Sequence, residues 1–382
     1  MTNQTVQINK GLEGIVVAET ALSKVFGEEG RLIYRGIPIQ EFVENDALYE
    51  EVVYLLWNGK LPTKAELDAF MADLASKRAL PDTVVNQITQ FPKTADPMVV
   101  LRTVVSMLHM YDENPDDLSP ENLRRIGSNL LAKFPTILAT FHRYRQGLDP
   151  VAPRTDLTHA ANYLYMLNGK EPGPRSVEGV NAYLVLLADH GFNASTFTAR
   201  VVAGTQADMY GAITGAVASL KGPLHGGAPT ALVKQMEEVG DPANAEKYVE
   251  EALAAKKRIM GIGHRVYKTY DPRARILKRM AENIAKETGN TRWYELAAAI
   301  EAAALPRLEA KRLYTNVDFY SVPLLLSLGL PTDMLTPTFA VSRVAGWVAH
   351  LLEQYADNRL MRPRSFYVGP EEAHYVPIDQ RG

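Results

Sequence analysis

Apolar residues recur at the spacing of an α-helix through most of this 382-residue chain, and this periodicity limits its fold more than any other feature. Between Leu101 and Leu108, Leu and Val occupy positions i, i+3, i+4 and i+7, which lie on one face of a helix. Similar spacing returns between Val344 and Tyr355. No regular alternation of strands with helices is visible, which argues against a doubly wound parallel sheet. We therefore predict an all-α fold.

Two short runs of β-forming residues, Gly14–Ala18 and Arg31–Tyr34, interrupt this pattern. We expect them to form one small sheet near the N-terminus. The segments that suit helices are 45–57, 63–78, 119–145, 155–168, 177–189, 194–219, 229–238, 242–257, 272–287, 291–305 and 337–355.

The composition excludes several classes of protein. Apolar residues make up 46% of the chain and charged residues 22%, so the chain can bury a core and is not disordered. A net charge of −3 provides no overall field for binding nucleic acid or an anionic membrane. The absence of cysteine excludes disulfides, thiolate nucleophiles and Cys-ligated metals. No signal or transit peptide and no membrane-spanning apolar stretch is visible, so we expect a soluble cytoplasmic protein.

Three of the eight histidines stand close to glycine, where flexible backbone leaves an imidazole open to a ligand. His190 precedes Gly191, His225 lies in the loop Gly222–Gly227, and His264 follows Gly263. We interpret these three as candidate proton donors or acceptors. The other five are predicted to be structural: His109, His142, His159, His350 and His374.

One carboxylate and three arginines complete the set of candidate site residues. Asp318 stands between Val317 and Phe319, where it either caps the start of a helix or acts as a base whose pKa burial has raised. The planar guanidinium groups of the arginines suit a substrate with two carboxylates: Arg273, Arg343 and Arg362. No spacing typical of a metal site or a dinucleotide fingerprint is present, so no metal or built-in cofactor is expected.

Small residues gather between about 200 and 228, where six glycines are interleaved with alanines. Small side chains at helical spacing let helices approach closely. The pattern indicates either tight packing within the chain or a helix pair that packs against its copy in a dimer.

Around these residues the sequence resembles the citrate synthase family. The segment Gly261–Arg273 (GIGHRVYKTYDPR) is similar to the family's signature. Three other motifs match in order and spacing: Gly222–Ala228, Asn316–Asp318 and Arg362–Pro363. Weaker similarities upstream extend the resemblance over nearly the whole chain, whose length is similar to that of the shorter, dimeric bacterial and archaeal members.

The resemblance implies an enzyme that joins acetyl-CoA to oxaloacetate and hydrolyses the thioester, giving citrate and CoA. By resemblance, Asp318 is the base that removes a methyl proton, and His225 donates a hydrogen bond to the thioester oxygen. His264 is then the general acid at the keto oxygen of oxaloacetate.

The resemblance also implies which residues bind the substrates. Oxaloacetate is held by His190, Arg273, Arg343 and Arg362, with Arg362 reaching in from the partner subunit of a homodimer. The adenine of CoA meets backbone groups of Ile259, Met260, Gly261, Ile262 and Gly263, and its phosphates meet Lys268 and Lys257. CoA is thus a substrate and no cofactor is implied.

Two domains are implied, which are expected to close over the substrates and exclude water. The large helical domain comprises residues 1–227 and 326–382, and the small helical domain comprises residues 228–325. The nearest alternative function is 2-methylcitrate synthase, which uses propionyl-CoA with the same three catalytic residues. The chain departs from the family's usual residues at Pro229–Thr230 and Val322, beside the site, so the acyl preference stays open. A catalytically inactive helical scaffold and a citrate-cleaving lyase domain are more distant alternatives.

Overall fold

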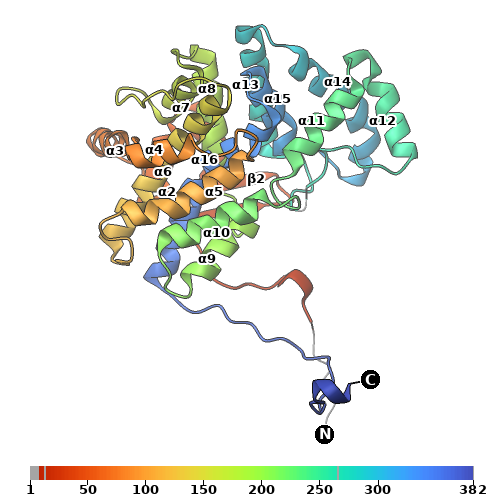
Figure 1. Cartoon of the computed structure of the whole chain (residues 1–382). Coiled ribbons are helices and arrows are strands. Elements are labelled where there is room, and N and C mark those ends of the chain that lie inside the picture. Colours follow the sequence, from red (N-terminus) through yellow and green to blue (C-terminus); the bar gives the residue numbers. More distant parts are fainter. Residues whose placement is uncertain (1–7, 13, 265, 382) are drawn as a thin grey trace.

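Helices dominate the computed structural model, which describes residues 8–12, 14–264 and 266–381 and confirms the predicted all-α fold (Figure 1). The α-helices of this part of the chain are α1 (Ile39–Glu44), α2 (Tyr49–Asn58), α3 (Lys64–Ser76), α4 (Asp82–Ile88), α5 (Pro97–Leu108), α6 (Pro120–Arg145), α7 (His159–Asn168), α8 (Pro174–Leu187), α9 (Ala194–Ala203), α10 (Met209–Lys221), α11 (Ala228–Val239), α12 (Ala245–Ala254), α13 (Pro272–Thr288), α14 (Arg292–Leu308), α15 (Val317–Ser327) and α16 (Leu335–Ala356). Short 3-10 helices are η1 (Lys10–Leu12), η2 (His109–Tyr111), η3 (Pro242–Asn244), η4 (Glu309–Lys311), η5 (Thr332–Met334) and η6 (Ile378–Gln380).

The small sheet near the N-terminus contains three antiparallel strands in chain order: β1 (Ser23–Phe26), β2 (Arg31–Tyr34) and β3 (Ile37–Pro38). The predicted strand at 31–34 is confirmed as β2, whose register with β1 runs from Ser23↔Tyr34 to Phe26↔Arg31. The predicted strand at Gly14–Ala18 is wrong, because those residues pair with no strand of the described chain. Tyr34 is fully buried whereas Val16 is 89% exposed, so only the later run has side chains that pack into the core.

Helix α16 runs through the larger group of helices and packs against α2, α6, α8, α9 and α10 (Figure 1). Its side chains Val344, Trp347 and Leu351 are fully buried. A helix surrounded in this way lies in the core of its domain. Any polar side chain on its inner turns is therefore held rigidly, and Arg343 is one of these.

The predicted helix 194–219 is wrong in one respect, because it is divided into α9 and α10. Gln206 adopts a left-handed backbone conformation (φ 63°) between them. Asp208 then caps α10 by accepting a hydrogen bond from the Gly211 N–H at 2.8 Å. The two helices pack closely on each other, and a Cβ at Gly215 would lie 3.4 Å from Thr198 and Val202. Close packing within the chain therefore accounts for part of the small-residue pattern.

Helices α11 to α15 form a second group, drawn in green-cyan to blue on the right of Figure 1. Within it, α15 packs against α11, α13 and α14, while α13 also packs against α8 of the first group. These helices begin at Ala228 and end at Ser327. The predicted division into residues 1–227 with 326–382 and residues 228–325 stays a prediction.

Both ends of the described chain leave the helical body on the same side (Figure 1). Their apolar side chains are exposed, as Val16, Phe366 and Tyr375 illustrate. No helix in the described ranges is long and apolar enough to cross a membrane.

Candidate active site

His264 lies between α12 and α13, and the backbone that follows it fixes its ring. Its Nδ1 accepts hydrogen bonds from the N–H groups of Val266 and Tyr267, each at 3.0 Å. Because an acceptor nitrogen carries no proton, the ring proton is on Nε2. Burial, followed by the charge of Arg273, lowers the pKa of His264 to about 4. The side chain is therefore a neutral imidazole that donates from Nε2.

His225 lies in the loop between α10 and α11, where its Nε2 is 2.8 Å from the hydroxyl oxygen of Ser195. That hydroxyl accepts a hydrogen bond from Trp347 Nε1 at 3.1 Å and lies 2.7 Å from Asn193 Oδ1. Its single proton has two competing acceptors, Asn193 and His225. When the proton points to His225, the ring proton is on Nδ1 and can be donated to a ligand. Burial, aided by the Arg343 charge, lowers the pKa of His225 to about 4.

Asp318 is in the first turn of α15 but does not cap it. The cap is Asn316, whose side chain accepts a hydrogen bond from the Asp318 N–H at 3.1 Å. The Asp318 carboxylate accepts no hydrogen bond from the described residues; the backbone oxygen of Asp318 accepts one from Ser321. Burial raises the pKa of Asp318 to about 6, although the charges of Arg273 and Arg343 oppose this shift. Such a carboxylate is ionised at neutral pH and ready to accept a proton.

Arg273 is buried at the start of α13 and is held by Asp271, the cap of that helix. Asp271 accepts from Arg273 Nε at 3.0 Å and from a terminal nitrogen at 2.8 Å. The same carboxylate accepts from the Val317 N–H at 3.1 Å. Asp271 therefore joins the start of α13 to the start of α15, and sets Arg273 beside the segment that carries Asp318.

Arg343 and His190 approach the same region from the first group of helices. Arg343 Nε donates to the carbonyl of Leu187 at 2.8 Å, and its terminal nitrogens have no hydrogen-bond partner in the described structure. Burial lowers the pKa of Arg343 to about 10, which leaves it charged at neutral pH. The Nε2 atom of His190 is buried without a partner among the described residues, and burial lowers the pKa of this histidine strongly. Both side chains thus have unsatisfied polar atoms that a ligand could pair.

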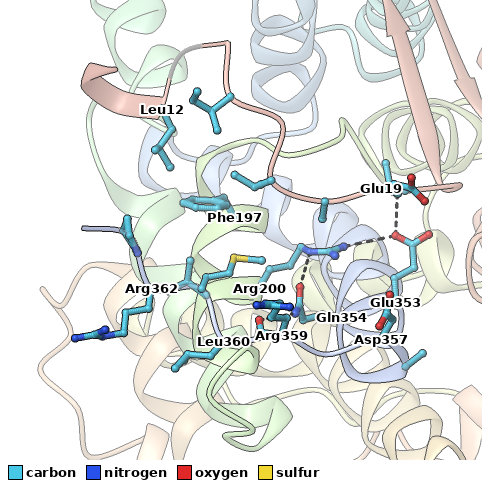
Figure 2. Close-up of a pocket in the computed structure, with 18 of the residues that line it drawn as sticks. Leu12, Glu19, Phe197, Arg200, Glu353, Gln354, Asp357, Arg359, Leu360 and Arg362 are labelled. Carbon is cyan, nitrogen blue, oxygen red and sulfur yellow. Dashed lines mark hydrogen bonds and ion pairs between the residues drawn. The ribbon is translucent and has the colours of Figure 1, made fainter. Parts of the chain in front are cut away.

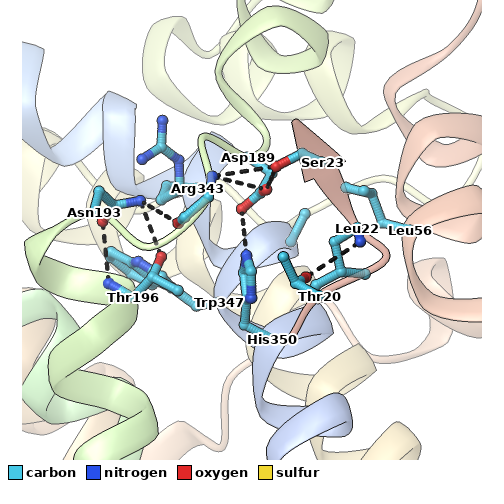
Figure 3. Close-up of polar contacts among 12 residues, drawn as sticks. Thr20, Leu22, Ser23, Leu56, Asp189, Asn193, Thr196, Arg343, Trp347 and His350 are labelled. Carbon is cyan, nitrogen blue, oxygen red and sulfur yellow. Dashed lines mark hydrogen bonds and ion pairs between the residues drawn. The ribbon is translucent and has the colours of Figure 1, made fainter. Parts of the chain in front are cut away.

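Asp189, directly before His190, anchors this part of the site (Figure 3). Its fully buried carboxylate accepts a short hydrogen bond from the Ser23 hydroxyl and one of 3.1 Å from the Gly191 N–H. His350 Nε2 lies 3.2 Å away, at the distance of an ion pair but not aligned as a hydrogen bond. Burial raises the pKa of Asp189, but His350 and Ser23 lower it overall. His350 contacts the carboxylate beside His190, and its structural role stays a prediction.

The candidate residues of the two helical groups lie close enough to influence one another electrostatically, and two of their rings are in contact. The rings of His190 and His264 are 5.6 Å apart, centroid to centroid. The Arg343 charge acts on His190, His225 and Asp318. The structure thus brings together six of the predicted residues: His190, His225, His264, Arg273, Asp318 and Arg343.

Arg362 lies apart from this cluster on its own chain. It lines a pocket of about 1240 Å³ between the N-terminal segment, α9 and the end of α16 (Figure 2). The arginine that binds a carboxylate in this pocket wall is Arg200, which lies 3.5 Å from Glu353. Arg362 itself is exposed, so a role in the cluster would require the site of another copy of the chain.

The segment Ile259–Gly263, predicted to meet CoA, lies between α12 and α13 beside α15. The Gly263 N–H donates to the Tyr314 carbonyl at 2.7 Å, and the Gly261 carbonyl accepts from the Asn316 N–H at 2.9 Å. Lys257 lines a pocket of about 280 Å³ together with Ile259 and Ile262. The same pocket is lined by three cations that the sequence did not single out: Lys256, Arg258 and Lys311. Lys268 follows His264 in the sequence, and its backbone N–H donates to the Gly27 carbonyl at 3.0 Å.

Three residues of the site were missed by reasoning from sequence: Asp189, Ser195 and Asp271. Asp189 and Asp271 stand directly before His190 and Pro272–Arg273, and a charge beside a candidate residue was the only available signal. Ser195 is one of many serines, and nothing in the sequence indicates that it contacts a histidine 30 residues later.

One group in the described part of the chain has the geometry of a metal site: the ligand atoms of His109, Asp116 and Asp208 lie within 4.8 Å of one another. Its polar atoms already have partners, since His109 Nε2 is 3.3 Å from Asp116 and Asp208 caps α10. The group contains none of the candidate site residues.

Comparison with known proteins identifies the family. A family model described as citrate synthase, C-terminal domain, matches residues 11–364. A citrate synthase of Deinococcus radiodurans is 46% identical over 98% of this chain and 99% of that relative. A 2-methylcitrate synthase of Corynebacterium glutamicum is 40% identical over 98% of this chain and 99% of the relative.

Solved structures agree with the sequence comparison. Citrate synthase from Pyrobaculum aerophilum has a TM-score of 0.92 and 42% identity, covering 97% of this chain and 95% of that one. Citrate synthase from Thermoplasma acidophilum, solved as a ternary complex with carboxymethyl coenzyme A and oxaloacetate, has a TM-score of 0.92 and 35% identity over 98% of this chain and 100% of that one. With these matches over nearly its whole length, the chain belongs to the citrate synthase family and is an acyltransferase.

Proposed function

We propose that this chain condenses acetyl-CoA with oxaloacetate and water to give citrate and CoA, with the chemistry carried by Asp318, His225 and His264. The observation that carries the assignment of roles is the Asp318 carboxylate. It is half-buried, accepts no hydrogen bond from the described residues, and has a pKa that desolvation raises to about 6. A desolvated, ionised carboxylate without hydrogen-bond donors is unfavourable, and in a catalytic site it is a ready base.

In the first step Asp318 takes a proton from the methyl group of acetyl-CoA. Negative charge then develops on the thioester oxygen, and a hydrogen-bond donor placed there lowers the barrier. His225 supplies this donor from Nδ1 when Ser195 donates to its Nε2. Because burial lowers the pKa of His225, the ring is neutral and donates this hydrogen bond as an uncharged imidazole.

In the second step the enolate carbon of acetyl-CoA attacks the keto carbon of oxaloacetate. His264 donates from Nε2 to the keto oxygen and gives up its proton as the carbon–carbon bond forms. The ring thereby gains negative charge, which the two N–H groups on Nδ1 and the nearby Arg273 stabilise. Water then hydrolyses the thioester bond and releases CoA.

Oxaloacetate is held by charged and polar groups that lack partners of their own. His190 Nε2 and the terminal nitrogens of Arg343 have none among the described residues, and Arg273 is oriented by Asp271. We further propose a homodimer in which Arg362 of the partner subunit completes the carboxylate site. The exposure of Arg362 and of the apolar terminal segments on one monomer supports this arrangement.

CoA is proposed to bind along Ile259, Met260, Gly261, Ile262 and Gly263, with Lys257 and Lys268 near its phosphates. The pocket lined by Lys257, Ile259 and Ile262 combines apolar walls with an excess of positive charge. That combination suits an adenine ring that carries phosphate groups. Residues 228–325 are proposed to move as a small domain against residues 1–227 and 326–382, which would bring Asp318 towards His225 and exclude water.

Release of CoA tests this function. With oxaloacetate present, we expect acetyl-CoA to give rapid thiol release and propionyl-CoA to give a lower kcat/KM. The relatives named citrate synthase in Deinococcus radiodurans and Bacillus subtilis are 45–46% identical, against 40–41% for those named 2-methylcitrate synthase in Corynebacterium glutamicum. A higher kcat/KM with propionyl-CoA would instead establish the 2-methylcitrate reaction, and no thiol release with either thioester would refute both.

A further inference from the structure

Glu301, in the middle of α14, is the acceptor of an unusually complete set of hydrogen bonds. Its Oε1 accepts from the hydroxyl of Tyr270 at 2.6 Å and from that of Thr315 at 2.7 Å. Its Oε2 accepts from the hydroxyl of Tyr320 and from Lys278 Nζ, each at 2.6 Å. An ionised carboxylate has about four lone-pair positions, so this one is saturated.

Three of the four donors come from the two segments that carry the proposed chemistry, and the fourth, Lys278, lies in α13. Tyr270 lies between His264 and Arg273, directly before the Asp271 that holds Arg273. Thr315 and Tyr320 lie three residues before and two residues after Asp318. One buried side chain therefore holds the loop of the general acid and both sides of the base.

The charge of Glu301 is stabilised by these same donors. Glu301 is 4% exposed, and burial alone would raise its pKa. Lys278, followed by the two tyrosine hydroxyls and Thr315, lowers the pKa overall. Hydrogen bonds to an ionised acceptor are shorter and stronger than neutral ones, so the four contacts form a rigid clamp.

We propose that Glu301 is a positioning residue that sets the Asp318 carboxylate and the His264–Arg273 loop in register for the condensation. The inference rests on the proposed function, because it assumes the roles of Asp318 and His264 given above. Glu301 touches neither residue directly and acts through Tyr320 and Tyr270.

The two tyrosines allow the two halves of the clamp to be separated. Small displacements of a catalytic group are costly, and about 1 Å can reduce the rate about 10²-fold. Tyr320→Phe is expected to lower kcat about tenfold and to raise the isotope effect of a deuterated acetyl-CoA methyl group, with the KM for oxaloacetate nearly unchanged. Tyr270→Phe is expected to raise the KM for oxaloacetate about tenfold with a smaller change in that isotope effect.

Glu301→Gln tests the shared acceptor of the four hydrogen bonds. It is expected to combine both effects, and adding Tyr320→Phe to it should lower kcat by less than about twofold more, because residues in one network are not additive. A matched control exists in the same group of helices, where the Tyr248 hydroxyl donates to the exposed Glu238 at 3.0 Å. Tyr248→Phe and Glu238→Gln should leave kcat and both KM values unchanged.

Thermal unfolding shows whether Glu301 has only a structural role, and the activity of Asp318→Asn shows whether the proposed function itself fails. If Tyr320→Phe and Tyr270→Phe lower the melting temperature but keep wild-type kcat, KM and isotope effect, Glu301 is merely structural and the inference is wrong. If Asp318→Asn is inactive in the same experiment, the proposed function survives that result. If Asp318→Asn is active, the proposed function fails and the inference fails with it.

Discussion

At Asp318 the requirements of chemistry and of stability conflict. The folded pKa is raised to about 6, whereas an aspartate in an unfolded chain titrates near 3.9. Ionisation of Asp318 therefore opposes folding. The cost is absent below about pH 4, grows between about pH 4 and 6, and is complete above about pH 6, where it reaches about 3 kcal/mol.

Asp318→Asn removes this titration and should change stability in a pH-dependent way. Relative to the wild type, the variant should gain about 2 kcal/mol in free energy of unfolding when the pH rises from about 4.5 to about 7.5. Denaturant unfolding at the two pH values measures the gain. A stability difference that is the same at both values would show that the carboxylate is not desolvated in the folded protein.

In the proposed mechanism, the Ser195 hydroxyl favours the His225 tautomer that carries its proton on Nδ1. In the proposed catalytic tautomer Ser195 donates to Nε2, so Ser195→Ala removes that donor and lets the ring adopt the tautomer that cannot donate from Nδ1. We expect kcat to fall about tenfold or more, since one oxyanion donor is weakened, with little change in the KM for oxaloacetate. Ser76→Ala is the control, because the Ser76 hydroxyl donates to the Asp73 carbonyl at the surface. Equal kcat values for the two variants would contradict the role of Ser195.

At the scale of elements, the connection between α12 and α13 is shaped by the start of α15. Gly261 has φ 78°, and a Cβ there would lie 2.6 Å from Phe319 Cδ2. Gly261→Ala therefore adds backbone strain of about 1–2 kcal/mol and pushes on the residue next to Asp318. We expect a lower kcat and a higher KM for acetyl-CoA.

Gly289, at the end of α13, provides the matched control for this prediction. Its φ is 74°, but a Cβ added there would meet no neighbouring atom of the described residues within 4 Å. Gly289→Ala should lower the melting temperature through the same backbone strain while kcat and KM stay at wild-type values. Loss of activity to the same extent in both variants would mean that strain alone, and not the contact with Phe319, disturbs the site.

Sequence predicted the elements and residues whose signal is local. Glycines beside His225 and His264 marked the two loops, and the β-rich run at Arg31–Tyr34 marked β2. Contacts between distant segments could not be predicted, because the hydrogen bond that joins Asp271 to Val317 spans 46 residues. Composition could not show the break between α9 and α10 either, since it depends on the capping geometry of Asp208.

At the scale of the whole molecule, the position of Arg362 predicts a shared site. A mixture of Asp318→Asn and Arg362→Leu chains, unfolded and refolded together, should contain about half hybrid dimers by random pairing. If Arg362 serves the partner subunit, one site of each hybrid carries both lesions and the other carries neither. About a quarter of all sites should then regain activity.

The opposite arrangement gives a different result in the same experiment. If Arg362 serves its own chain, one site of each hybrid lacks Asp318, the other lacks Arg362, and none is restored. Activity no higher than that of the two parent variants would therefore exclude the shared site. Refolded wild-type chains, treated in the same way, show how much activity the procedure recovers.

The kcat of Asp318→Asn for CoA release from acetyl-CoA and oxaloacetate tests the proposed base most directly. The chain has no cysteine, so a thiol reagent detects only the CoA that is released. We expect kcat to fall at least about 10²-fold in a variant that remains folded, because proton removal by a positioned base contributes about 10²–10⁴-fold. Asp241→Asn, which alters an exposed helix cap in the same group of helices, should keep wild-type kcat. A folded Asp318→Asn enzyme with near wild-type kcat would contradict the assignment of Asp318 as the base.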